Sequence, residues 1–366
     1  MGGSGSTHQG AGQRAHIGSF ASGGGRGITT AAVDPVTGAL TVLGVVDGMG
    51  DTSCLAPSAD RQVLYAAGGT DQGLVAAYRI TADGLAPLGR PVAVDGLAPV
   101  HLSVVGDRLL IADYASGSVR GLRIAGDGRP QGPAAVLRHR GRGPDPERQA
   151  GPHAHHVTAD PSGRWVLSVD LGTDSVRVCG PDPADGFLRV RAETPLRAGS
   201  GPRELAFHPC GDVAYVIHEL EPQLTVCRWD ADSGRLYPTG EVSLGSADAA
   251  ADASAAADAS AVAETREYPS VALVSEDGRF VRAAIRGSNL IVTLSLADGP
   301  EKPRITGVAN CGGQWPRHLA AGPAGRLYVS NEWSGDVTWF DADPGSGRLH
   351  PAGRLDVPPA ACVVFA

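Results

Sequence analysis

Ionisable side chains crowd into residues 143–157, a loop that leads into an alternating apolar segment. Its end carries His153 and His155, two positions apart and therefore on one face of an extended chain. A polar turn at 160–164 and a second apolar run ending in Asp170 follow, a pattern typical of a β-hairpin. Because hairpin strands are antiparallel, we expect His155 and Asp170 to lie close together.

Composition favours one large all-β unit. The 366 residues include 51 Gly and 27 Pro, spread along the chain, so elements are short and helix is the minority. The net charge of -8 without a basic stripe excludes a nucleic-acid binder. Six cysteines without CxxC spacing are expected to be free thiols in a reducing compartment. No apolar signal or membrane segment is visible, so we expect a cytoplasmic protein.

A recurring unit can be aligned on its turns. Successive turn glycines lie 57, 48, 67 and 47 residues apart, at Gly106, Gly163, Gly211, Gly278 and Gly325. Around each turn, two alternating strands are followed by a third strand, an Asp-x-x-x-Gly-x-Leu turn and a fourth strand. Four antiparallel strands at a period near 48 predict the blade of a β-propeller.

The two ends of the chain complete the count. The five glycine turns and a sixth turn at Asp60–Arg61 give six blades, and residues 16–20, 27–33 and 39–45 supply three strands without a preceding first strand. The tail at 361–365 supplies the fourth, which predicts a seven-bladed β-propeller closed by both termini. We expect residues 1–15 to be a disordered N-terminal segment and 16–366 the propeller, with a low-complexity loop at 246–263. The other insertion, 138–151, is expected to form a wall or lid over a site.

Superposing the units on their turns brings chemically active residues to equivalent places. One set starts the innermost strands, and the other ends the second strands; both are expected around one mouth of the central channel. The first set is His155, Arg203, Ser270 and Arg317. The second set is Asp170, Glu219, Arg286 and Glu332.

Charges near a narrow mouth need partners or a ligand. Salt bridges between blades, such as Arg203 with Glu219, are one interpretation. The other is a site for an anion, with arginines as bidentate anchors for carboxylate or phosphate. In that site Glu219 and His155 are the best general acid/base candidates.

Two further features leave alternatives open. His153 and His155 could bind a metal with Asp170. Two histidines and one carboxylate are weak support for a metal site, however, and nearby arginines would repel a cation, so we predict no metal and no cofactor. Trp315 and Trp333 flank Arg317 and Glu332, where either blade packing or substrate stacking explains them.

Several motifs in order resemble one known family. They are residues 143–157, Val169 to Asp174, Gly201–Pro–Arg203 with Glu219, Tyr268–Pro–Ser270 with Arg286, and Trp315–Pro–Arg317–His318. From about Ile17 to Phe365 the chain resembles the lactonase-type seven-bladed propellers, which include bacterial 6-phosphogluconolactonases and fungal carboxymuconate lactonizing enzymes.

The resemblance implies a site and a reaction. By motif position, His155, Arg203, Glu219 and Arg286 look like the catalytic set of the muconate branch, while the loop at 143–157 looks like the phosphogluconolactonase branch. We expect hydrolysis of a small anionic sugar lactone, 6-phosphogluconolactone first, by a monomer. Supporting substrate contacts are expected from His153, Asp170, Arg317 and Glu332.

Other activities stay open at this point. The alternatives are a cycloisomerase acting on a muconate-type diacid and a non-catalytic binding module. Two of the positions that depart from the family pattern directly precede candidate residues: Ile285 stands where Asn commonly precedes Arg286, and His218 stands where Asn often precedes Glu219.

Overall fold

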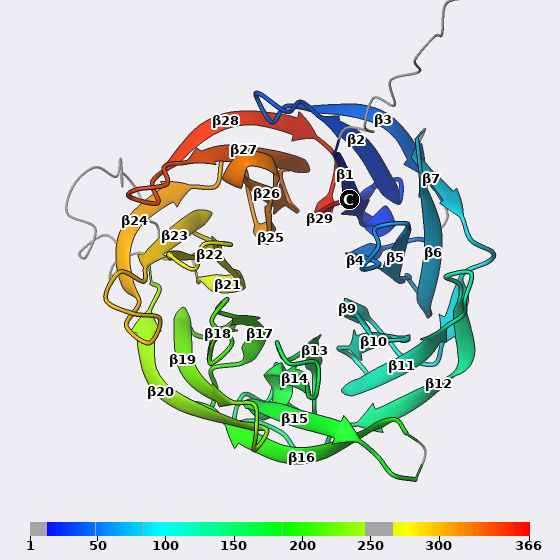
Figure 1. The fold of residues 1–366 in the computed structure, drawn as a ribbon, viewed down its shortest axis with the longest axis vertical. Helices are drawn as coiled ribbons and strands as arrows, with labels where there is room; N and C mark the ends of the chain where they lie inside the picture. Colours follow the sequence, from blue (N-terminus) through cyan, green and yellow to red (C-terminus); the bar gives the residue numbers. More distant parts are fainter. Residues whose placement is uncertain (1–12, 48, 83, 185, 246–265) are drawn as a thin grey trace, which may run out of the picture.

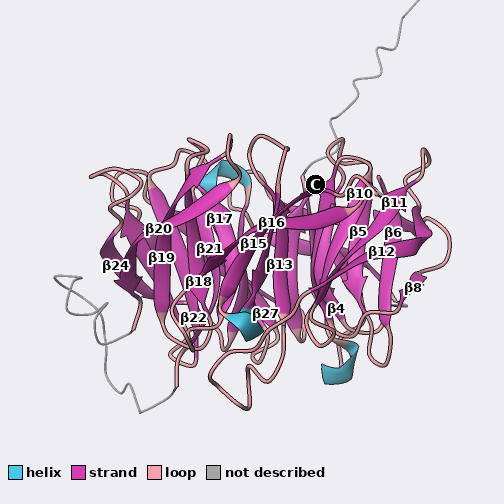
Figure 2. Ribbon diagram, turned by 90° about the horizontal axis from the view of Figure 1, so that it is seen from below, coloured by secondary structure: helices cyan, strands magenta, loops and turns pink. Residues whose placement is uncertain are grey.

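Seven antiparallel sheets, six of four strands and one of five, are arranged in a ring in a computed structural model that describes residues 13–366 except 48, 83, 185 and 246–265 (Figure 1). The predicted seven-bladed propeller is confirmed. Seen from the side, the strands run between two faces of a disc, with loops on both faces (Figure 2). The predicted low-complexity loop at 246–263 and residues 1–12 lie outside the described residues. No helix in the described part of the chain is long and apolar enough to cross a membrane.

The four strands of each blade follow one another from the channel outward. The blade that holds both termini consists of β29 (Ala360–Phe365), β1 (Arg14–Ser19), β2 (Ile28–Val33) and β3 (Leu40–Val46). The next consists of β4 (Thr52–Pro57), β5 (Val63–Gly68), β6 (Gly73–Thr81) and β7 (Gly84–Pro87), with β8 (Val92–Val94) also paired to β6. The third consists of β9 (Pro99–Val105), β10 (Arg108–Asp113), β11 (Ser118–Ile124) and β12 (Pro130–Arg138). The fourth consists of β13 (Ala154–Ala159), β14 (Val166–Asp170), β15 (Ser175–Pro181) and β16 (Leu188–Pro195).

The remaining blades have the same strand order. The fifth consists of β17 (Pro202–Phe207), β18 (Val213–His218), β19 (Gln223–Asp230) and β20 (Arg235–Ser243). The sixth consists of β21 (Tyr268–Val274), β22 (Phe280–Arg286), β23 (Leu290–Ser295) and β24 (Arg304–Asn310). The seventh consists of β25 (Pro316–Ala321), β26 (Leu327–Asn331), β27 (Asp336–Ala342) and β28 (Leu349–Asp356). Three 3-10 turns, η1 (Ala21–Gly23), η2 (Leu171–Thr173) and η3 (Pro323–Gly325), complete the regular elements described.

The two chain ends close the ring. Strand β1 pairs antiparallel with β29, with Ala15 opposite Phe365 and Ile17 opposite Val363. The sheet therefore continues from the last strand of the chain into the first, as the sequence predicts. Strand β1 begins at Arg14, two residues before the expected start of the propeller.

Apolar cores lie between neighbouring blades. Alternate residues of one sheet pack against alternate residues of the next, as period-2 strands require. In one such cluster Tyr215 and Ile217 of β18 lie with Val281, Ala283 and Ile285 of β22, all fully buried. The blades are thereby held at fixed angles, which fixes the positions of the innermost strands.

A β-bulge interrupts the innermost strand of every blade. In each, the pairing between first and second strands skips one residue near the start of the first strand. Such a bulge re-aims a side chain. We call the seven skipped residues the inner ring: Ala361, Ser53, Val100, His155, Arg203, Ser270 and Arg317.

Candidate active site

The channel mouth gathers side chains from the inner ring and from a second set. We call outer ring the residues that end or directly follow each second strand. Their backbones pair with residues at or just before the start of each first strand. The outer ring is Phe20, Gly69, Tyr114, Leu171, Glu219, Arg286 and Glu332. A cavity of about 90 Å³ is lined by five inner-ring residues among others: His155, Arg203 and Arg317, and the small Ser53 and Ala361. The charged residues thus converge on a space bordered by short side chains.

Glu219 is the centre of the arginine cluster. Its Oε2 accepts hydrogen bonds from Arg203 Nε at 3.0 Å and Arg286 Nη2 at 2.8 Å, and its Oε1 accepts one from Arg148. Burial opposes ionisation, yet the charges of Arg286 and Arg203 hold the pKa of Glu219 well below its usual value. An ionised carboxylate with both oxygens occupied positions guanidinium groups; it is a weak proton acceptor.

Arg148 is a site residue that turn alignment missed. It comes from the 138–151 insertion, which lies outside the repeated unit and so has no equivalent to align. Fully buried Gln149 anchors this loop, donating from Nε2 to Leu171 O and Asp174 Oδ1, both at 2.8 Å. The contact from Arg148 to Glu219 supports the expectation that the insertion forms a wall of the site.

His155 is a buried, neutral imidazole. Burial first, and then the charge of Arg203, lowers the pKa of His155 well below its usual value. Within the described residues no side chain or backbone group hydrogen-bonds to its ring nitrogens, and the ring lies edge-on to Tyr114 with centroids 5.8 Å apart. A neutral histidine with uncommitted nitrogens can accept a proton from water.

The three other arginines differ in how fully they are engaged. Arg203 is 4% exposed, and burial, followed by the charge of Arg286, lowers its pKa to about 9. Arg286 donates from Nε to Tyr268 O at 2.9 Å. Among the residues that the structure describes, Arg317 forms one ion pair, with Glu332, Nη1 to Oε2 at 3.2 Å, and its guanidinium lies 4.9 Å from the ring centroid of Phe20.

These groups leave the mouth positively charged. Four arginines face two carboxylates, Glu219 and Glu332, and four minus two gives +2 with His155 neutral. Glu204, 3.7 Å from Arg203 Nη1, adds only a partial charge at neutral pH, because burial raises its pKa to about 7. Repulsion among partly desolvated guanidinium groups is relieved by an anion. The mouth is therefore suited to a phosphorylated or dicarboxylic ligand.

The structure places Asp170 away from the mouth. Its side chain is fully buried; Oδ1 accepts from the backbone of His153, Gly172 and Thr173, and Oδ2 lies 2.6 Å from His139 Nδ1 and 3.1 Å from Arg177 Nη1. This carboxylate fixes the local loops and does not face the ligand space, which corrects the expected substrate contact.

The reason is a one-residue offset. Ala154 pairs with Asp170, just as Pro202 pairs with His218 and Pro316 with Asn331. Asp170 is thus equivalent to the residue before Glu219, and Leu171 occupies its outer-ring position. In a strand a shift of one residue turns a side chain to the opposite face.

His153 and Ser270, two other expected residues, make hydrogen bonds to backbone carbonyl groups. His153 donates from Nδ1 to Tyr114 O at 2.9 Å and stacks on the Tyr114 ring, so it does not join His155 and Asp170 around a common point. No group of three His, Cys, Asp or Glu side chains with metal-binding geometry occurs in the described residues. Ser270 joins blades, its hydroxyl lying 2.7 Å from Pro316 O.

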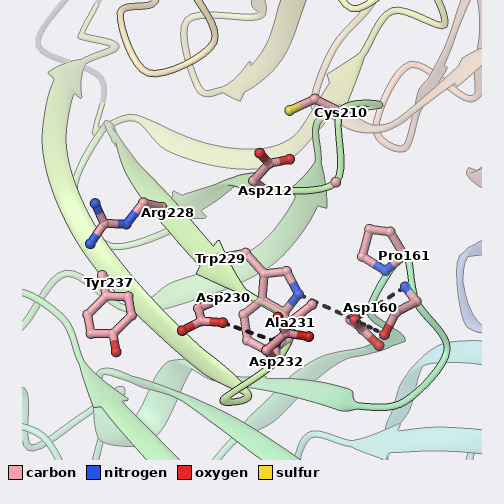
Figure 3. A pocket seen from close by; sticks show the side chains of 12 residues that line it. Asp160, Pro161, Cys210, Asp212, Arg228, Trp229, Asp230, Ala231, Asp232 and Tyr237 are labelled. Carbon is pink, nitrogen blue, oxygen red and sulfur yellow. Dashed lines mark hydrogen bonds between the residues drawn. The ribbon is translucent and has the colours of Figure 1, made fainter.

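A larger hollow lies elsewhere, at turns that join first to second strands and at the turn that joins β19 to β20 (Figure 3). Its volume is about 720 Å³, and Asp160, Cys210 and Tyr237 are among its lining residues. These turns lie at the strand ends opposite the inner ring. Asp160 accepts hydrogen bonds from Trp165 N at 2.8 Å and Trp229 Nε1 at 3.3 Å, so its carboxylate stabilises the turns. We assign no function to this hollow.

Comparison with known proteins decides the family. The family described as Lactonase, 7-bladed beta-propeller matches residues 14–365. The chain belongs to this lactonase family. It is 30% identical over 356 residues to the 6-phosphogluconolactonase of Bacillus subtilis (strain 168), covering 96% of this chain and 97% of the relative.

Solved structures of similar proteins share the whole lactonase propeller. The periplasmic gluconolactonase PpgL of Pseudomonas aeruginosa superposes with a TM-score of 0.85 at 26% identity, covering 96% of this chain and 98% of that chain. A protein from Lactobacillus plantarum gives a TM-score of 0.85 at 26% identity, covering 97% and 99%.

The two departures from the lactonase pattern have structural explanations. His218 is fully buried, with Nδ1 2.8 Å from Ser200 Oγ and Nε2 2.7 Å from Thr225 Oγ1, so it braces the chain before Glu219. Ile285 belongs to the core between blades. The backbone carbonyl groups of Tyr268 and Pro269 orient Arg286 where an amide side chain is absent.

Replacing His218 with Gln should make stability less sensitive to acid. Burial lowers the pKa of His218 to about 4, so below the unfolded pKa of 6.5 the unfolded state binds more protons, and stability decreases as the pH is lowered. By pH 5 this one group costs about 2 kcal/mol. Urea unfolding of wild type and His218→Gln at pH 7 and pH 5 measures the difference. Exposed His350→Gln is the control, and equal losses in wild type and His218→Gln contradict the prediction.

Proposed function

We propose that this protein hydrolyses 6-phosphogluconolactone to 6-phosphogluconate at the mouth of the propeller channel. A sugar lactonase is the activity supported by its family and by the names of its relatives. One observation supports a phosphorylated substrate: arginines outnumber carboxylates around the neutral imidazole of His155, whose nitrogens have no hydrogen-bond partner among the described residues.

In this mechanism His155 takes a proton from a water molecule while the oxygen of that water bonds to the lactone carbonyl carbon. The carbonyl oxygen becomes an oxyanion, and Arg203 with Arg286 stabilises that charge from a desolvated position. Collapse of the intermediate breaks the bond to the ring oxygen, which receives the proton from the imidazolium. The product is an open-chain hydroxy acid, and no covalent enzyme intermediate forms.

Glu219 acts as a positioning residue in this proposal. It holds three guanidinium groups by both oxygens, and its low pKa keeps it ionised during turnover. Arg317 keeps donors available beyond its contact with Glu332 and is the proposed phosphate anchor. Hydrogen bonds between a guanidinium and a phosphate are charge-assisted and bidentate, which favours phosphorylated over plain lactones.

Replacing Arg317 with Gln is expected to raise KM for 6-phosphogluconolactone about tenfold to a hundredfold, with a smaller effect on glucono-1,5-lactone. Phosphate recognition is lost while the reacting groups remain. Initial rates on both lactones measure the effect, with exposed Arg304→Gln as the control. Equal KM changes for the two lactones would show that Arg317 does not recognise phosphate.

The proposal is tested directly by rates on a panel of phosphorylated and plain sugar lactones. Hydrolysis of 6-phosphogluconolactone well above the spontaneous rate supports it. Loss of diene absorbance from a muconate-type diacid, without lactone hydrolysis, would indicate cycloisomerisation instead. A cytoplasmic location is part of the proposal and agrees with six free cysteine thiols.

A further inference from the structure

Two tryptophans at the rim form a stacked pair that the proposed reaction does not use. The rings of Trp315 and Trp333 are 3.7 Å apart between centroids and 5° from parallel. Trp333 is 64% exposed, so its second face is open to solvent. Neither residue belongs to an apolar cluster between blades in the described part of the chain, so packing alone does not explain the pair.

The pair is joined to the catalytic mouth. The Arg286 guanidinium lies 5.3 Å from the centroid of the Trp315 ring, and Arg286 itself bonds to Glu219. Trp333 directly follows Glu332, the partner of Arg317. The aromatic surface therefore begins where the arginine cluster ends.

The backbone holds this surface in place. Trp315 has a φ of 63°, a left-handed conformation that is unusual for a bulky residue and is concentrated at functional sites. Its amide donates to Asn289 Oδ1 at 2.7 Å, and its carbonyl oxygen accepts from Glu332 N at 3.0 Å. Trp333 N donates to Gln314 O at 3.1 Å, which ties the second tryptophan to the same loop. A ligand would meet a preformed platform.

We propose that Trp315 and Trp333 form a subsite for a second sugar ring, so that the site also accepts glycosylated aldonolactones, such as the lactones of oxidised disaccharides. This inference rests on the proposed lactonase function and extends its substrate class. A pyranose ring presents a face of C–H groups that packs on an indole, while its hydroxyl groups remain in water. The lactone ring would occupy the arginine-lined mouth, and the attached sugar would lie over Trp333.

The test compares maltobionolactone with glucono-1,5-lactone. We expect wild type to hydrolyse the disaccharide lactone with kcat/KM at least equal to that for the monosaccharide. Trp333→Ala should lower the ratio of the two kcat/KM values about tenfold, and Trp333→Phe by less. Tyr237→Ala, which removes a half-exposed aromatic ring at the opposite strand ends, is the matched control and should leave the ratio unchanged. A ratio within twofold of wild type in Trp333→Ala would overturn the subsite.

A binding measurement separates this inference from the proposed function. Maltobionate and gluconate, the open-chain products, are titrated into wild type and Trp333→Ala by calorimetry. Tighter binding of maltobionate that depends on Trp333 supports the subsite even where no lactone is hydrolysed, a result that would reject the lactonase mechanism alone. Equal affinities for the two acids in wild type would reject the subsite alone.

Discussion

Replacing His155 with Gln is expected to lower kcat for lactone hydrolysis by about two to four orders of magnitude. Glutamine fills similar space but cannot accept the proton that water must lose. The imidazole is 8% exposed and lacks a hydrogen-bond partner among the described residues, so replacing it leaves no neighbouring polar group without a partner. Steady-state rates at pH 7.5 measure the loss, and exposed His350→Gln is the control.

The pH dependence of kcat/KM provides a second test of His155 as the base. Burial and Arg203 lower the pKa of His155, so the neutral, active form persists below pH 6.5 and is lost only as pH falls through the lowered value. The acid limb of kcat/KM in wild type should therefore lie below pH 6.5, and His155→Gln should lack it. An unchanged acid limb in His155→Gln would assign the base to another residue.

Replacing Arg203 with Ala should lower kcat/KM by about two to three orders of magnitude, the usual cost of a lost oxyanion donor. Arg203→Lys should not restore the rate, because an ammonium cannot reproduce the planar fork that bonds to Glu219 and the Ser270 carbonyl together. Rates for both variants on 6-phosphogluconolactone measure these effects.

Stability should respond far less than activity to the loss of Arg203. Glu219 keeps Arg148 and Arg286 as partners, and repulsion between Arg203 and Arg286 is removed. Thermal unfolding of Arg203→Ala should therefore lie close to that of wild type, with exposed Arg304→Ala as the control. Near-normal turnover in a folded Arg203→Ala would refute its proposed role.

The propeller was predictable because its signals repeat. Turn glycines, alternating strands and unpaired segments at both ends indicated seven blades and the pairing of β29 with β1. Repetition in the sequence alone also brought His155, Arg203 and Arg317 to equivalent inner-ring positions. Each lies at a bulge, which a pattern of alternating residues does not reveal.

Where repetition fails, prediction fails too. The turn of the seventh blade is one residue shorter than those of the fourth and fifth, so a count of seven or eight residues from the turn glycine was accepted. The count of seven placed Asp170 with Glu219 although its side chain turns the other way. Arg148 lies in an insertion that has no counterpart in other blades, so its contact with Glu219 depended on tertiary structure. The stacking of Trp315 on Trp333 likewise joins two loops across one blade.

The pairing of β29 with β1 has a consequence for synthesis. The innermost strand of the first blade is made from the last residues of the chain, Ala360–Phe365. Blades made from earlier residues can form while the ribosome is still translating, but β1 keeps an unpaired edge until Ala360–Phe365 have been made. The ring therefore becomes continuous only after those residues have left the ribosome, and a nascent chain that stalls before they emerge would expose that edge to other strands.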